Sequence, residues 1–93
     1  MKQIPKALLE AMVAARERTI VVADTAQRTI AASPYPDRAH GYMSLYLENA
    51  LNTAVDMKDS FLNGTLTMGH ITALNMDMDE IVSAMLKLAT GDY

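Results

Sequence analysis

The sequence contains no cysteine, which excludes disulfide bonds and metal sites built from thiolates. It also lacks any apolar run near the ~18 residues that a membrane-spanning helix needs. The N-terminal stretch carries charge at Glu10 and Arg16, where a secretory signal peptide has a long uncharged segment. We therefore expect a cytoplasmic protein with no membrane partner.

Positive charge is in the minority. Eight Lys and Arg residues stand against 11 Asp and Glu residues, so the formal net charge is −3 at pH 7. Most of the basic residues lie within residues 1–38, and most of the acidic residues lie within residues 39–93. A protein that holds the phosphates of a nucleic acid needs a basic surface, so we expect no nucleic-acid partner.

Aromatic residues are also few, at 5% of the chain, although hydrophobic residues make up 51%. Much of the apolar content is alanine and methionine, which favour helices. We therefore predict one all-α domain spanning residues 1–93. A helical domain this small buries a limited share of its apolar surface, and self-association covers more of it. For that reason we expect a homo-oligomer.

A first helix is predicted from Pro5 to about Ala32. Proline suits the first turn of a helix, and apolar residues recur at helical spacing throughout the segment. The β-branched run at residues 19–22 favours a strand locally, so a break with Asp24 capping a second segment is the alternative. The residues that hold this spacing are Leu8, Met12, Ala15, Thr19, Val22, Ala26 and Ile30, and those that widen the stripe are Leu9, Val13, Ile20 and Ala23.

A second helix is predicted over residues 37–63. Two prolines keep the residues before them, Ser33 and Tyr35, extended, Asp37 is the expected N-cap, and Gly64 is the expected C-terminal stop. The short connection places this helix antiparallel to the first, as a helical hairpin. An apolar seam at spacings of three and four predicts self-association, or packing within the chain. The seam consists of Met43, Leu47, Ala50, Ala54, Met57 and Phe61.

The remainder of the chain predicts one or two further helices. Thr67 is a candidate cap for a short helix over residues 68–74, and an ordered loop is the alternative because the segment contains a glycine. Asp77, followed three residues later by Glu80, resembles a capping box at the start of a C-terminal helix that ends at Gly91. The predicted fold is thus a long antiparallel helical hairpin plus a C-terminal helix, with three or four helices in all. The predicted buried face of the C-terminal helix is Met78, Ile81, Val82, Met85, Leu86 and Ala89.

The sequence offers little for catalysis. Its two histidines, His40 and His70, have no paired nucleophile nearby, and no nucleophile elbow or phosphate-binding loop is present. Oxygen-bearing side chains alternate over residues 75–79 as at the start of a Ca²⁺ loop, but Glu80 stands where such a loop needs glycine, and Leu86 where it needs glutamate. We therefore predict no metal site, no cofactor and no enzymatic activity.

One face of the second helix is the candidate ligand or partner site. Tyr42, Tyr46 and Asn49 follow one another at helical spacing, and Arg38 lies one turn earlier. Tyrosine combines a flat ring with a hydroxyl group, which suits an interface or a ring-shaped ligand, and Arg38 adds a contact for an anion. The plain structural interpretation is a pair of half-buried tyrosines at the edge of the hairpin.

The same helix also carries a resemblance. Arg38 followed by Leu47, Glu48, Ala50 and Ala54 resembles a helix pattern in small phage proteins that sequester cyclic oligonucleotide immune signals. The pattern covers a short part of the chain and consists mostly of heptad spacing, so it does not assign the chain to that family. It keeps ligand sequestration among the functions considered.

These observations favour a small non-enzymatic helical interaction protein, a homo-oligomer that binds another macromolecule as an adaptor or inhibitor. An accessory protein encoded by a phage or mobile element would fit this description. The alternative is an oligomer that binds or sequesters a small, nucleotide-like ligand between its subunits. The sequence identifies neither the protein partner nor the ligand.

Overall fold

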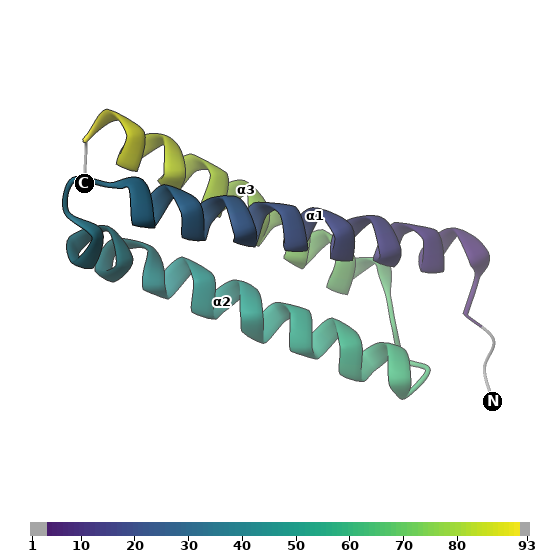
Figure 1. Cartoon of the computed structure of the whole chain (residues 1–93). Coiled ribbons are helices and arrows are strands. Elements are labelled where there is room, and N and C mark those ends of the chain that lie inside the picture. Colours follow the sequence, from purple (N-terminus) through teal and green to yellow (C-terminus); the bar gives the residue numbers. More distant parts are fainter. Residues whose placement is uncertain (1–3, 92–93) are drawn as a thin grey trace.

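Three long helices make up the structure, and there is no strand among residues 4–91, the part of the chain that it describes (Figure 1). The computed structural model places α1 at Lys6–Ala32, α2 at Pro36–Leu62 and α3 at Met68–Thr90. Its principal dimensions are 51 × 18 × 16 Å. The prediction of an all-α fold with a helical hairpin and a C-terminal helix is confirmed.

α1 is one continuous helix that passes through residues 19–22 without a break. The β-branched residues are accommodated because helical spacing on both sides buries one face, and because Thr19 Oγ1 donates to the Ala15 carbonyl oxygen at 2.8 Å. Asp24 forms an ion pair within the helix rather than capping a new one. The alternative of a break at Asp24 is therefore wrong. The buried residues of α1 are Ala15, Val22, Ala26 and Ile30.

α2 begins one residue earlier than predicted, with Pro36 in its first turn and Tyr35 as the N-cap residue. The residue before a proline is kept out of the α region, and Tyr35 accordingly has φ −128° and ψ 76°. Asp37 lies inside the first turn, where its negative charge complements the helix dipole. The prediction of Asp37 as N-cap is therefore wrong. The predicted end is confirmed, because Gly64 adopts φ +71°, the left-handed conformation that closes a helix.

α3 is a single helix of 23 residues, where the sequence pattern predicts either two helices or a loop and a helix. Thr67 precedes its first turn, as predicted. His70 completes the cap, because its Nδ1 accepts a hydrogen bond from the Thr67 backbone N–H at 3.0 Å. Asp77 lies within the helix, so its assignment as an N-cap is wrong. A continuous buried stripe runs through that point: Ile71, Leu74, Met78, Ile81, Ala84 and Leu88.

The buried stripe also corrects the predicted face of the C-terminal helix. Met78 and Ile81 are buried as predicted, and Met85 is partly buried. Ala84 and Leu88 are buried as well, because a helix that starts at residue 68 turns this side toward the other two helices. Three residues predicted to be buried are exposed instead: Val82, Leu86 and Ala89.

α3 packs along both other helices, whereas α1 and α2 contact each other less. Figure 1 shows α1 and α2 running antiparallel, with α3 beside them. The hairpin is therefore present, but most of its packing comes from α3. Small and flexible side chains fill the centre, and Ala26, Ala39 and Met43 have no exposed surface. This arrangement leaves α1 and α2 uncovered on the side away from α3.

Candidate functional site

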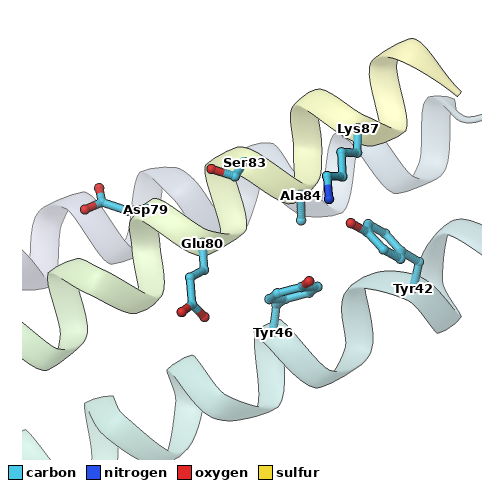
Figure 2. Close-up of a pocket in the computed structure, with 7 residues that line it drawn as sticks. All are labelled: Tyr42, Tyr46, Asp79, Glu80, Ser83, Ala84 and Lys87. Atoms are coloured by element: carbon cyan, nitrogen blue, oxygen red, sulfur yellow. The ribbon is translucent and has the colours of Figure 1, made fainter. Parts of the chain in front are cut away.

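A cleft lies between α2 and α3, with two tyrosine rings from α2 facing a row of side chains from α3 (Figure 2). The rings of Tyr42 and Tyr46 meet edge to face, with centroids 5.8 Å apart and planes at 60°. The volume of the cleft is about 400 Å³, within the range of roughly 300–1,000 Å³ that small-molecule sites occupy. Its lining residues are Tyr42, Tyr46, Asp79, Glu80, Ser83, Ala84 and Lys87.

The cleft follows from the pairing of two antiparallel helices. Tyr42 and Tyr46 are one turn apart and so project from the same side of α2. The antiparallel course of α3 brings residues 79–87 opposite them. Ala84 is buried there, and its small side chain leaves room between the helices. The structure thus brings the two predicted tyrosines together, while their binding of a ligand stays a prediction.

The two ends of the cleft carry opposite charges. Glu80 and Lys87 are seven residues apart on α3, which is about 10 Å along the helix axis. Figure 2 shows the Glu80 side chain extending toward Tyr46 and the Lys87 side chain extending toward Tyr42. Within residues 4–91, neither Glu80 nor Lys87 forms an ion pair. Both charges are therefore available to a ligand.

Asp79, the other acidic residue of the lining, belongs to a contact between α1 and α3. Nη1 of Arg18 donates to the backbone oxygen of Asn75 at 3.2 Å and to its side-chain oxygen at 3.1 Å. Nη2 of Arg18 pairs with the Asp79 carboxylate. Glu80 is therefore the carboxylate of the cleft that keeps its hydrogen-bonding capacity for a ligand.

Arg38 and Asn49 flank the two tyrosines on α2 but do not line the cleft. Both side chains are exposed, one turn before Tyr42 and one turn after Tyr46. Two of the four predicted site residues thus come together. The charged residues opposite them on α3 are absent from the prediction, because the spacing along α2 does not indicate which helix faces it.

The apolar seam of α2 lies in the core of the single chain. Met43, Ala50 and Met57 are at most 5% exposed. The other helices of the same chain already cover these three side chains, so a second copy has no access to them. This corrects their assignment to self-association. The other seam residues are partly buried against the same core: Leu47, Ala54 and Phe61.

A different apolar surface remains open on the side of α1 and α2 away from α3. We call it the outer face, and it consists of Val13, Ile20, Leu51, Val55 and Leu62. Each of these residues is between 47% and 68% exposed. Ile20 lies about 200° around α1 from Arg18, which contacts α3. Val55 likewise lies about 180° around α2 from Tyr46, which faces α3.

Similarity to known proteins assigns no role to these surfaces. No family model, curated protein or solved structure matches the chain. The described residues include no group of three His, Asp or Glu side chains placed to hold a metal ion. None of the three helices, over the residues that the structure describes, has the length and apolar character of a membrane span. The cleft and the outer face are the candidate sites that the geometry itself offers.

The two histidines lie apart from both surfaces. His70 joins the last turn of α2 to the start of α3, with Nε2 at 3.1 Å from Ser60 Oγ and Nδ1 bonded to the N–H of Thr67. Both of its ring nitrogens therefore have structural partners. His40 is an exposed residue near the start of α2.

Proposed function

We propose that this protein is a small non-enzymatic helical interaction protein that pairs with a second copy of itself through the outer face and, as that dimer, binds another macromolecule. The observation that carries the proposal is the outer face itself. Its five large apolar side chains are aligned on two adjacent helices and exposed to solvent. Monomeric soluble proteins rarely leave a large contiguous apolar patch uncovered, and such patches mark interaction sites.

The dimensions of the outer face suit a dimer. α1 and α2 have 27 residues each, so each helix is ~40 Å long and ~10 Å wide. Two such helices side by side present on the order of 800 Å², the area that a standard interface buries on each partner, and the segments that carry the outer face, residues 13–20 and 51–62, make up roughly a third of it. The apolar residues would therefore form the centre of a contact of standard size, and the polar surface of the two helices would form its rim.

A second copy is the occupant that the surface favours. Most homodimers have two-fold symmetry, so the same patch on both copies meets itself. Because α1 and α2 are antiparallel, the apolar segments at residues 13–20 and 51–62 lie beside each other, and a two-fold pairing lets each copy cover the apolar side chains of the other. The pairing also supplies the apolar burial that a 93-residue chain lacks when alone.

The apolar surface continues past the helices into a groove at one end of the molecule. There the start of α1 lies across from the end of α2 and the connection that follows it. Leu62 belongs to both the outer face and the groove, which extends the contact available to the second copy. The groove is lined by Ile4, Pro5, Leu9, Phe61, Leu62, Asn63, Gly64, Thr65, Leu66 and Thr67.

A charge placed in the outer face tests the proposal. Ile20→Glu and Val55→Glu should shift the chain from a dimer to its 10.2 kDa monomer in light scattering after size-exclusion chromatography, because a dimer would bury the new carboxylate unpaired. Val21→Glu and Leu45→Glu are matched controls, since these side chains are 64% and 63% exposed and lie about 80–120° around their helices from the residues of the outer face.

The two pairs of variants are expected to differ. If all four keep the mass of the unmodified chain, the outer face is not the contact. If the two control variants dissociate the dimer as readily as Ile20→Glu and Val55→Glu, added charge alone explains the effect and the proposed surface is wrong.

A further inference from the structure

The cleft between α2 and α3 has the chemistry of a site for an organic cation, and it lies on the opposite side of α2 from the outer face. We propose that it binds a guanidinium group, carried either by an arginine side chain of a partner protein or by a small free guanidine. Glu80, Tyr46 and the nearby carboxylate of Asp77 lead to this assignment. The site stands independently of the proposed dimer.

Glu80 supplies the charge partner. Its carboxylate lies toward the Tyr46 ring and forms no ion pair within residues 4–91 (Figure 2). A carboxylate accepts two parallel N–H bonds from a guanidinium group, a geometry that the single ammonium group of lysine does not reproduce. The neighbouring Asp79 already binds the guanidinium group of Arg18 in the same chain.

The tyrosine rings supply a surface on which a planar cation can stack. A guanidinium group is attracted to the face of an aromatic ring and stacks on it better than an ammonium group does. The ring planes of Tyr42 and Tyr46 are at 60° to one another, so the two rings offer a cation aromatic surfaces in two different orientations. A cation in the cleft thus meets an aromatic surface on one helix and a carboxylate on the other.

The Tyr46 end of the cleft favours a cation over an anion. Glu80 lies at this end, whereas Lys87 lies at the other end, where Arg38 also flanks Tyr42 on α2. Asp77 lies one turn before Glu80, and its Oδ2 is buried with no hydrogen-bond partner. The negative charge of Asp77 adds to the potential that attracts a cation. Lys87 opposes that potential from the far end of the cleft. A substitution at Lys87 therefore distinguishes a cationic ligand from an anionic one.

The test is a titration of the full chain with blocked arginine (acetyl-arginine amide), followed by amide chemical shifts in NMR. The comparison ligand is blocked citrulline, which has the same shape but carries no charge. We expect saturable shifts around Tyr46 and Glu80, with blocked citrulline binding at least about tenfold more weakly, since a charged hydrogen-bonded pair is lost. Equal binding of the two ligands, or no saturable binding of blocked arginine, would overturn the proposal.

Three exposed positions give the matched variants. Glu80→Gln should weaken blocked arginine about tenfold. Glu48→Gln, about 200° around α2 from Tyr46, should leave its affinity unchanged. Lys87→Gln should tighten binding about two- to threefold, because a nearby like charge is removed. Unchanged affinity in Glu80→Gln, or weaker binding in Lys87→Gln, would overturn the proposal, the latter by pointing to an anionic ligand.

A final comparison of ligands distinguishes the two possible sources of the guanidinium group, a partner protein and a free guanidine. Tighter binding of short arginine-containing peptides than of ethylguanidinium supports a partner protein, and equal binding of the two supports a free guanidine. Light scattering of Glu80→Gln should show the mass of the unmodified chain, so loss of ligand binding and loss of the dimer are separate results.

Discussion

His70 Nε2 lies 3.1 Å from Ser60 Oγ, which makes one imidazole ring the link between the last turn of α2 and the first turn of α3. The other ring nitrogen, Nδ1, accepts the backbone N–H of Thr67. Because Nδ1 accepts, the ring proton is assigned to Nε2, which then donates to the serine hydroxyl. A histidine for which the sequence indicates no catalytic partner thus fixes the connection between two helices.

Loss of this imidazole should destabilise the fold. His70→Ala should lower the free energy of unfolding by about 1–2 kcal/mol, because the cap and the link to Ser60 are both lost. His70→Gln should cost less, since glutamine at this position also accepts the N–H of the N-cap residue. Urea denaturation at a fixed protein concentration measures both values, and an equal loss in the two variants would show that the cap contributes little.

The guanidinium group of Arg18 links α1 to α3, and its replacement by the ammonium group of lysine should destabilise the fold. Arg18→Lys should cost about 1 kcal/mol, because one ammonium group cannot contact both oxygens of Asn75 and the Asp79 carboxylate together. The coupling energy between Arg18 and Asp79 in a double-mutant cycle should stay below about 1 kcal/mol, since the side chains are 37% and 70% exposed. A coupling well above that value would mean that the ion pair itself holds the helices together.

Met43 should behave as a core residue and Leu45 as a surface residue. Met43 has no exposed surface, so Met43→Ala should lower the free energy of unfolding by about 2–5 kcal/mol. Leu45→Ala should change it by no more than about 0.5 kcal/mol. Denaturation monitored by circular dichroism separates the two. Comparable losses would place Leu45 in a contact that the single chain does not show.

Two glycines, Gly41 inside α2 and Gly64 just after its end, should respond to replacement by alanine with opposite signs. Gly64→Ala should destabilise by about 1–2 kcal/mol, because φ +71° brings a Cβ close to the following carbonyl oxygen. Gly41 lies inside the helix with nothing within 4 Å of an added Cβ, so Gly41→Ala should stabilise by about 1 kcal/mol. Thermal unfolding of both variants checks the signs, and a stabilised Gly64→Ala would contradict the assignment of that turn.

The first two helices could be predicted from sequence because their signals are local. Helical spacing continues through residues 19–22, prolines stand between α1 and α2, and Gly64 ends α2. The start of α3 is harder to predict. Asp77 followed by Glu80 has the pattern of a capping box, but the same two residues can also stand in the middle of a helix, as they do here. The deciding signal was the apolar spacing that runs unbroken from Ile71 to Leu88.

The candidate sites depend on long-range pairing, which local spacing does not encode. Tyr42 and Tyr46 could be placed on one side of α2 from their spacing alone. Which helix faces them, and therefore the roles of Glu80 and Lys87, emerged only with the antiparallel packing of α3. The same packing decides which apolar stripe of α2 is covered within the chain and which is left open.

The mass of the unmodified chain in solution tests the central claim most directly. Sedimentation equilibrium over a wide range of protein concentrations should show a particle of twice 10.2 kDa that dissociates on dilution. The melting temperature should rise with protein concentration for the same reason. A mass of 10.2 kDa at every concentration, with a melting temperature that does not depend on concentration, would contradict the account.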